Sequence, residues 1–345
     1  MTDTKRSPRA AVLLVQLGTP DKPEVPEVRR YLREFLTDRR VVEQSPWLWW
    51  PILHTMVLTR RPKESAEKYR SIWASEGSPL LINTRLQAQA LQDELNKRGR
   101  LVEVVWAMRY GSPSMVQALR DLRDRGFSRI LVMPMYPQYS ASTSATVFDV
   151  IAREFLTWRS IPALRFVQDF HDDPGYIAAV AESIRQSWRQ SEQGKPEKLV
   201  FSFHGLPQDC VEQGDPYQKQ CQASAVLIAE ALGLTREDWL VTFQSRFGRA
   251  EWLKPYTQPT VEALARKGIR TVDVVCPGFL SDCIETLEEI NMEVHNAFLG
   301  AGGKRFRYIH CLNDAPLWIH ALADIVGSEL SGWKTREVDQ VRRRG

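Results

Sequence analysis

Two stretches of the sequence follow one pattern: "RGFSRILVMPMYPQYSASTSATVFDVIAREF" (125–155) and "KGIRTVDVVCPGFLSDCIETLEEINMEVHNAF" (267–298). Each begins with a basic residue and a glycine, and continues through an apolar run to a proline and an aromatic residue. Each then passes a serine into a helical pattern. The segments ahead of them, "VVWAMRYGSP" (104–113) and "VTFQSRFGRA" (241–250), also match in outline. A repeat of this length predicts two similar halves.

Apolar runs of strand length alternate with helical patterns along most of the chain. The run "AAVLLVQLG" (10–18) predicts a buried strand, and 25–36 places apolar residues at helical spacing. Such alternation is typical of parallel sheets with helices on both faces. We therefore predict an α/β protein whose two halves meet near residues 160–195. A cleft between two such halves is a common ligand site.

The composition argues for a soluble globular protein. The 345 residues are 43% hydrophobic and 26% charged, and 46 basic residues nearly balance 42 acidic ones. That charge balance gives no reason to expect a nucleic-acid partner. We find no signal peptide and no apolar run near the ~18 residues of a membrane span. The five cysteines are odd in number and lack CxxC spacing, so a reducing cytoplasm is the expected compartment.

A single histidine ends the apolar run in "LVFSFHGLP" (199–207). Gly205 and Pro207 mark a turn directly after His204. In open parallel sheets, ligands bind at the carboxyl ends of strands. The pattern alone leaves two interpretations, a histidine at a ligand site or a structural histidine that caps a strand.

Three glutamates, Glu285, Glu289 and Glu293, recur every four residues, and no Lys or Arg lies between residues 279 and 303. On a helix this spacing forms one slowly turning stripe of carboxylates. The stripe is either a solvated acidic face or a place for cations. Imidazole and carboxylate together suit ferrous iron, and they can also move protons.

Seven blocks carry a resemblance to one family. The chain resembles the ferrochelatases in "LVFSFHGLPQDCVEQGDPYQKQC" (199–221) and "CPGFLSDCIETLEEI" (276–290). Five more blocks match in the family's order: "VLLVQLGTP", "RRPKESAEKYRSIWASEGSPL", "AMRYGSPS", "MYPQYSASTSA" and "TFQSRFGRAEWLKP". The resemblance covers roughly residues 10–325. Ferrochelatases insert ferrous iron into a porphyrin, as the last step of protoheme synthesis.

The resemblance implies two Rossmann-like, chelatase-type domains with parallel sheets flanked by helices and the active-site cleft between them. We expect a first domain at 1–160 with a porphyrin lip at 45–62, a second at 161–325, and a tail at 326–345. The resemblance makes His204 and Glu285 both catalytic and metal-binding, and continues an acidic column through Glu289 and Glu293. It assigns a further set to the porphyrin pocket: Leu17, Arg60, Arg61, Tyr69, Arg109, Tyr110 and Trp252. Whether His204 accepts a proton, binds iron or does both stays open.

The resemblance also implies the ligands and the location. Protoporphyrin IX and ferrous iron are the expected substrates, with no permanently bound cofactor. Ala141 and a tail without cysteine lack the ligands of the iron–sulfur cluster that some members carry, so no cluster is expected. The short tail favours a monomer. The tryptophan-rich lip favours peripheral association with the inner face of the cell membrane.

Three alternatives remain at this stage. One branch of the family acts on coproporphyrin III and usually carries a tyrosine where this chain has Leu17, so the leucine favours protoporphyrin. A non-catalytic tetrapyrrole or metal carrier would share the fold. A cobalt chelatase of the corrin pathway would share it too, although such enzymes tend to have more histidine in place of the acidic stripe.

Overall fold

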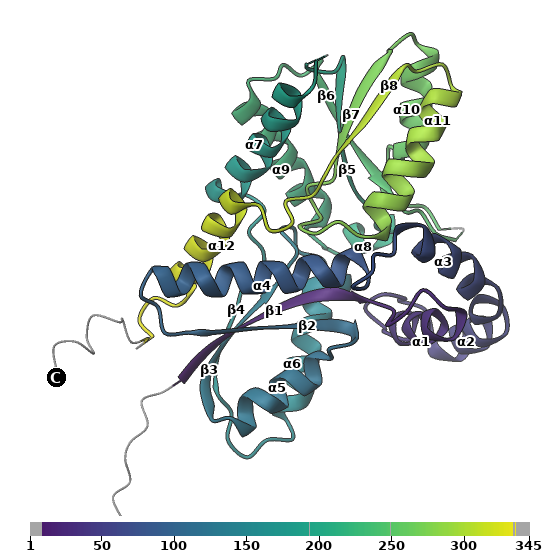
Figure 1. Cartoon of the computed structure of the whole chain (residues 1–345). Helices are drawn as coiled ribbons and strands as arrows, with labels where there is room; N and C mark the ends of the chain where they lie inside the picture. Colours follow the sequence, from purple (N-terminus) through teal and green to yellow (C-terminus); the bar gives the residue numbers. More distant parts are fainter. Residues whose placement is uncertain (1–8, 193, 249, 334, 336–345) are drawn as a thin grey trace, which may run out of the picture.

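The computed structural model describes residues 9–192, 194–248, 250–333 and 335, and it contains two four-stranded parallel sheets (Figure 1). The first sheet has the order β2 (Glu103–Gly111), β1 (Arg9–Thr19), β3 (Phe127–Pro134), β4 (Ala163–Phe166). The second has the order β6 (Trp239–Gln244), β5 (Lys198–His204), β7 (Thr271–Val275), β8 (Arg305–Ile309). The two orders are equivalent strand by strand. The predicted fold class and the predicted duplication are therefore confirmed.

Helices cover both faces of the first sheet, which explains why β1 is apolar along its length rather than alternating. Successive residues of a strand point to opposite faces. Val12 and Leu14 accordingly pack with α4 (Pro79–Lys97), and Leu13 packs with α5 (Met115–Asp124) and α6 (Thr146–Phe155). The same arrangement is repeated around the second sheet.

In the second half, Phe201 of β5 packs with α7 (Pro174–Gln190) and α9 (Tyr217–Leu232). Val200 packs on the opposite face with α10 (Thr257–Arg266), η3 (Glu285–Val294) and α11 (His295–Gly300). A short helix, α8 (Gln208–Glu212), follows β5. Both halves therefore have three layers, and the carboxyl ends of their central strands are the places where a ligand would bind.

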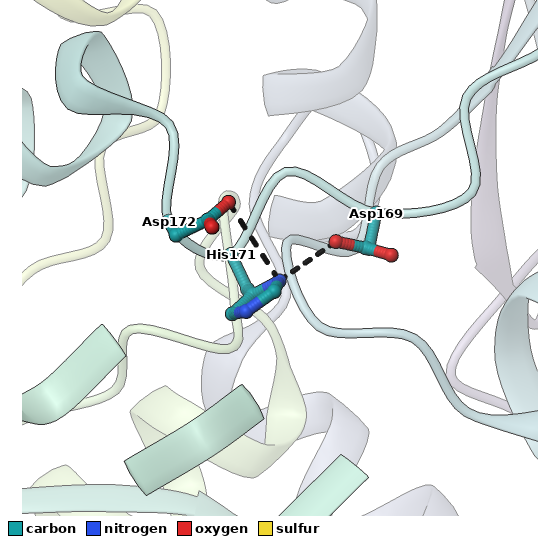
Figure 2. Close-up of side chains that lie close together, drawn as sticks. All are labelled: Asp169, His171 and Asp172. Atoms are coloured by element: carbon teal, nitrogen blue, oxygen red, sulfur yellow. Dashed lines mark hydrogen bonds and ion pairs between the residues drawn. The ribbon is translucent and has the colours of Figure 1, made fainter. Parts of the chain in front are cut away.

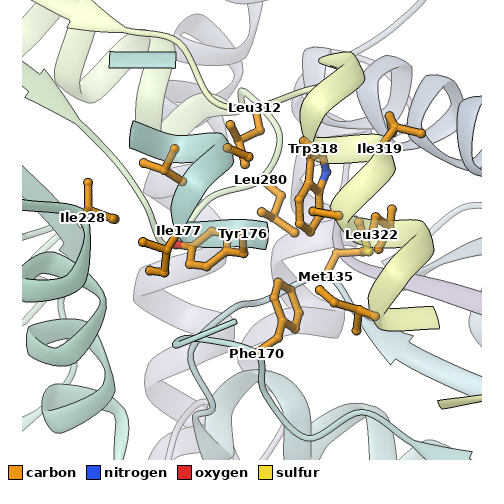
Figure 3. Packing of buried hydrophobic residues seen from close by; sticks show 14 of the residues in the cluster. Met135, Phe170, Tyr176, Ile177, Ile228, Leu280, Leu312, Trp318, Ile319 and Leu322 are labelled. Atoms are coloured by element: carbon orange, nitrogen blue, oxygen red, sulfur yellow. The ribbon is translucent and has the colours of Figure 1, made fainter. Parts of the chain in front are cut away.

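One hydrophobic core joins the two halves. Helix α12 (Pro316–Glu329) packs against both α7 and α4. Figure 3 shows its residues Trp318 and Leu322 beside Phe170, Tyr176 and Met135. Because this core is continuous, the halves are held in a defined relation around the space between their sheets.

The structure also bears on the expected boundaries. Strand β4 lies beyond residue 160 yet pairs with β3, so we propose the boundary at residues 167–173 instead. Helix α12 continues past residue 325, and Leu330 is fully buried. Arg165 donates a hydrogen bond to the Ser331 carbonyl and stacks on the Trp333 ring. The expected tail is thus packed through residue 333, whereas residues 336–345 lie outside the described part.

The predicted lip, residues 45–62, lies within a larger helical insertion between β1 and α4. This insertion consists of α1 (Val25–Leu36), α2 (Pro46–Ile52), a π-helical turn η1 (Leu53–Val57) and α3 (Leu58–Ile72), which lie together beside the first sheet (Figure 1). These segments share a small core that includes Tyr31, Leu53 and Tyr69. Among the described residues, no helix combines the length and the apolar character needed to cross a bilayer.

Candidate active site

A cleft with about 990 Å³ of space free of protein atoms, part of it open to solvent, lies between the two halves. Its walls come from both: Leu17 and Tyr69 from the first, and His204, Phe279 and Glu285 from the second. Further lining residues are mostly apolar or aromatic, among them Phe35, Ile72, Leu80, Met135, Tyr136, Leu280 and Ile284. The cleft therefore suits a largely apolar ligand that needs an imidazole and a carboxylate at one point.

The duplication places Leu17 and His204 at matching positions, because each directly precedes the glycine of a "G-x-P" turn after a central strand. Neighbouring backbone atoms leave no room for a side chain at either glycine. A Cβ on Gly205 would lie 2.6 Å from the Gln244 carbonyl oxygen, and one on Gly18, where φ is +125°, would lie 1.8 Å from the Tyr110 carbonyl oxygen. The backbone is thus fixed directly after each of the two side chains.

His204, the last residue of β5, is half-buried in the cleft wall. Its Nδ1 lies 2.7 Å from the Gly205 carbonyl oxygen. A carbonyl oxygen only accepts hydrogen bonds, so in the neutral ring Nδ1 carries the hydrogen and Nε2 keeps a lone pair. The rings of Trp252 and Phe279 flank the imidazole, with centroids 6.5 and 6.4 Å away. This arrangement favours a histidine at a ligand site over a strand cap.

Glu285 is the first residue of η3 and lines the cleft. The Gln244 amide donates a hydrogen bond of 2.7 Å to its backbone carbonyl, which holds the first turn against β6. The segment from Glu285 to Val294 is a π-helix rather than the α-helix that the four-residue spacing predicted. A π-helix bonds residue i to i+5, and such turns are frequent at functional sites. The surroundings of the three carboxylates differ because each one meets a different neighbouring segment.

Glu289 faces Ser245, whose backbone amide donates a 2.7 Å hydrogen bond to its carboxylate. Burial raises the pKa of Glu289, although hydrogen bonds from Ser245 and the nearby His204 oppose the shift. Glu293, in contrast, is exposed, and its carboxylate pairs with Lys68 of α3 at 2.7 Å. The same ammonium lies 2.9 Å from Glu288. The column therefore has a counter-ion, contrary to the interpretation from local sequence, because Lys68 reaches it from the distant helix α3.

The other predicted pocket residues occupy several environments. Leu17 and Tyr69 line the cleft. Trp252 pairs with Pro207 in an isolated bridge and packs behind Gly205, so it contacts the cleft through His204. Arg61 stacks on the ring of Phe247 at 4.0 Å, and Arg60 is exposed on α3. Only part of the expected set is thus brought together at the cleft wall.

Arg109 and Tyr110 are not among the residues that line the cleft. The Tyr110 hydroxyl donates a 2.9 Å hydrogen bond to Asp38, and the Arg109 guanidinium pairs with the same carboxylate. Arg109 also donates to the Thr146 carbonyl at 3.1 Å. The pair therefore fastens the loop ahead of α2 to the start of α6. Asp38 was missed by sequence reasoning, because its isolated position carries no motif.

Asp282, at the turn before η3, is nearly fully buried and is bound from three sides. Tyr308 and Asn313 donate hydrogen bonds to its carboxylate at 2.6 and 2.8 Å, and the His310 ring nitrogen lies at 2.9 Å. Burial alone would raise the pKa of Asp282, but the hydrogen bonds from His310, Tyr308 and Asn313 lower it to about 2. This cluster ties the start of η3, and so Glu285, to the end of β8.

A second group of ligand-type side chains lies outside the cleft, on the loop between β4 and α7 (Figure 2). Within it, the His171 ring nitrogen lies 2.7 Å from Asp169 and 3.9 Å from Asp172. The Ser224 hydroxyl donates a 2.7 Å hydrogen bond to the His171 carbonyl, which anchors the loop on α9. The hydrogen bonds of His171 to Asp169 and Ser224 account for this group as part of the local loop structure.

Comparison with known proteins agrees with this geometry. The family model described as Ferrochelatase matches residues 9–330. Ferrochelatases from a Polaromonas species and from Bordetella pertussis are 53% and 54% identical to the chain over 338 and 327 residues, covering 97% and 95% of it and 92% and 90% of their own lengths. One from Aromatoleum aromaticum is 54% identical over 326 residues, which is 94% of this chain and 89% of the relative.

Solved structures support the fold. SirB from Bacillus subtilis with Fe3+ superposes with a TM-score of 0.57 at 13% identity, covering 95% of this chain and 99% of that one. The sirohydrochlorin chelatase SirB from Bacillus subtilis subspecies spizizenii in complex with cobalt gives 0.54 at 12% identity, with the same coverages. At such low identity these structures support the two-domain chelatase fold alone. On the family model and the close relatives, the chain belongs to the ferrochelatase family.

Proposed function

We propose that this protein inserts ferrous iron into protoporphyrin IX and releases two protons, a lyase reaction that forms protoheme. One observation carries the proposal: the His204 ring, whose Nδ1 lies 2.7 Å from the Gly205 carbonyl oxygen, lines a largely apolar cleft that Glu285 also lines. The apolar walls suit the faces of a macrocycle, and the two polar groups suit its centre.

The substrate's own chemistry defines the task. A free porphyrin carries two pyrrole N–H groups inside a planar ring, so iron enters only when the ring is bent and both protons leave. Walls contributed by both halves can bind the rest of the macrocycle and use that binding energy to hold a bent ring. The core around α12 supports this role, because it keeps the two walls in a defined relation.

His204 is the proposed acceptor of a pyrrole proton. With Nδ1 hydrogen-bonded to the Gly205 carbonyl, Nε2 of the neutral ring has a free lone pair that can accept a proton and return it. Glu285, which lines the same cleft, is proposed to bind the incoming iron, since the single Nε2 lone pair of His204 is used for the proton. Glu289 is proposed to hold the displaced proton, since burial raises its pKa.

Leu17 supports protoporphyrin over coproporphyrin III. It stands at the position that matches His204 in the other half and lines the same cleft. An apolar residue there offers a metal no donor atom and adds to the apolar wall. We keep coproporphyrin III as the competing substrate and compare the two directly in the experiment below.

The lip supports peripheral association with a membrane. Trp47, Leu48 and Trp50 of α2 are 90%, 68% and 61% exposed, and Met56 in η1 is 57% exposed. Exposed tryptophans next to aliphatic residues are typical of segments that lie at a membrane interface. A poorly soluble porphyrin would then reach the cleft from the bilayer. The proposed location is the cytoplasmic face of the cell membrane, with the protein acting as a monomer.

Anaerobic assays with protoporphyrin IX and ferrous iron test the proposal. We expect iron-dependent loss of porphyrin fluorescence, together with a haem product identified by its absorption spectrum, and a higher kcat/KM than with coproporphyrin III. A carrier would bind the porphyrin and release it unchanged on extraction. Cobalt insertion into sirohydrochlorin without iron insertion into either porphyrin would point to the corrin-pathway alternative and overturn the proposal.

A further inference from the structure

Helix α3 carries two cations, Arg61 and Lys68, that both contact the second half of the molecule. They are seven residues apart, and two turns of an α-helix bring such residues to the same face. Arg61 stacks on the ring of Phe247, in the loop after β6. Lys68 binds the carboxylates of Glu288 and Glu293 on η3, at 2.9 and 2.7 Å. We call these contacts the α3 seam.

The two carboxylates that Lys68 binds differ in their surroundings. Glu288 is nearly buried, with 11% of its side chain exposed, whereas Glu293 is 45% exposed. Burial raises the pKa of Glu288 and outweighs the opposing effect of Lys68. Burial by itself would lower the pKa of Lys68, but its hydrogen bonds to Glu293 and Glu288 raise it, so the ammonium stays charged. The carboxylates of Glu288 and Glu293, at the outer end of η3, therefore share one charged lysine as their partner.

The inner end of η3 is different. Glu285 lines the cleft, and the carboxylate of Glu289 is held by the amide and hydroxyl of Ser245, which are neutral donors. Negative charge that can attract a metal ion is thus concentrated towards the cleft. Tyr69, the residue after Lys68, lines that same cleft. One helix therefore contacts both the proposed ring site and the outer carboxylates.

Resting on the proposed function, we propose that Lys68 is a positioning residue for metal delivery. Its ammonium occupies the space that a divalent cation would take between Glu288 and Glu293. Metal ions are consequently directed to Glu285 in the cleft rather than retained at the outer end of η3. The same contact holds α3 against η3, so that the cleft wall at Tyr69 and the helix that carries Glu285 keep one spacing.

Manganese binding to the full-length protein without porphyrin tests the first part of the proposal. Free Mn2+ is read by its electron paramagnetic resonance signal, so the test needs no turnover. Lys68→Met keeps the aliphatic stem and removes the charge. We expect this variant to bind one additional Mn2+ ion between Glu288 and Glu293. The affinity of that site for Mn2+ should rise by about tenfold or more over the wild type, because a unit positive charge ~4 Å away is removed. Adding Glu293→Gln to this variant should abolish the gain.

Two matched variants separate charge from packing. Lys68→Arg keeps the charge and should bind Mn2+ like the wild type. Arg61→Met removes the contact with Phe247 but keeps Lys68 paired with Glu288 and Glu293. It should therefore also bind no additional Mn2+. In steady-state assays, Lys68→Met should raise the KM for iron more than it lowers kcat, and Lys68→Arg should restore the KM.

The outcomes are distinguishable from failure of the proposed function, because Mn2+ binding is measured without porphyrin or turnover. If Lys68→Met binds no more Mn2+ than the wild type, the proposal is wrong even when iron insertion is confirmed. Equal losses of kcat and thermal stability with an unchanged KM for iron would assign Lys68 a purely structural role and overturn it as well.

Discussion

Replacing Asp282 by asparagine removes the charge that Tyr308, His310 and Asn313 hold at the start of η3. The pKa of Asp282 falls from 3.8 to about 2 in the folded protein, so the ionised form is stabilised by about 2 kcal/mol. With about 2.1 cal/mol/K of unfolding entropy per residue, this corresponds to about 3 °C in Tm for 345 residues. Asp282→Asn should therefore lower Tm by about 3 °C near pH 6.

The dependence on pH identifies the cause. A lowered carboxyl pKa contributes stability that is present above the unfolded value of 3.8 and is lost as the pH falls through about 2. The difference in Tm should thus shrink to about half by pH 3. The hydrogen bond with Asp282 raises the pKa of His310. The stability that this pair contributes is therefore present below pH 6.5 and is lost as the pH rises through the raised pKa of His310. His310 is largely exposed, which makes the alkaline decline shallower.

Thermal scans of the wild type and Asp282→Asn between pH 3 and pH 9 measure the difference. Asp324→Asn is the matched control, since Asp324 is 74% exposed and pairs with Arg98 at the surface. Such surface pairs contribute little, so the control should shift Tm by less than about 1 °C at every pH. A difference for Asp282→Asn that stays constant across this range would refute the electrostatic reasoning.

His204→Ala should lower kcat by about 10²–10⁴-fold in stopped-flow assays while porphyrin affinity and Tm stay near wild type, and a lower Tm with normal kcat would instead assign a structural role. Trp47→Ser/Trp50→Ser should shift the protein to the soluble fraction in vesicle sedimentation and raise the porphyrin KM, whereas Leu156→Ser, which changes an equally exposed apolar residue outside the lip, should do neither. Trp49 is left intact, because its ring nitrogen donates a 2.7 Å hydrogen bond to the carbonyl of Leu36 in α1. Chemical analysis of the isolated protein should find no acid-labile sulfide, and stoichiometric sulfide and iron would contradict the expected absence of a cluster.

The strands, the duplication and the family could all be predicted from the sequence, because each depends on local order. Buried parallel strands are continuous apolar runs, and the two repeats follow the same order of residue types around β3 and β7. His204 could be predicted as well, since it directly follows such a run and precedes a turn. These features need no knowledge of which segments meet in space.

The surroundings of the charged residues were decided by the tertiary structure. Local sequence predicted a stripe of carboxylates without counter-ions, but Lys68 reaches Glu288 and Glu293 from a helix more than two hundred residues away in the chain. Likewise, Arg109 and Tyr110 are directed to Asp38 instead of the cleft. A buried charge needs a partner from whichever segment packs against it, and sequence spacing does not identify that segment.

The sequence by itself thus determined the two α/β halves, the strand that ends in His204 and the helical segment that carries Glu285. Only the tertiary structure decided that these two side chains line one cleft, that η3 is a π-helix beginning at Glu285, and that its outer carboxylates pair with Lys68. The physical reason is the range of the interactions. Hydrophobic periodicity acts between near neighbours in the chain, whereas burial, hydrogen bonding and ion pairing of polar groups depend on contacts between distant segments.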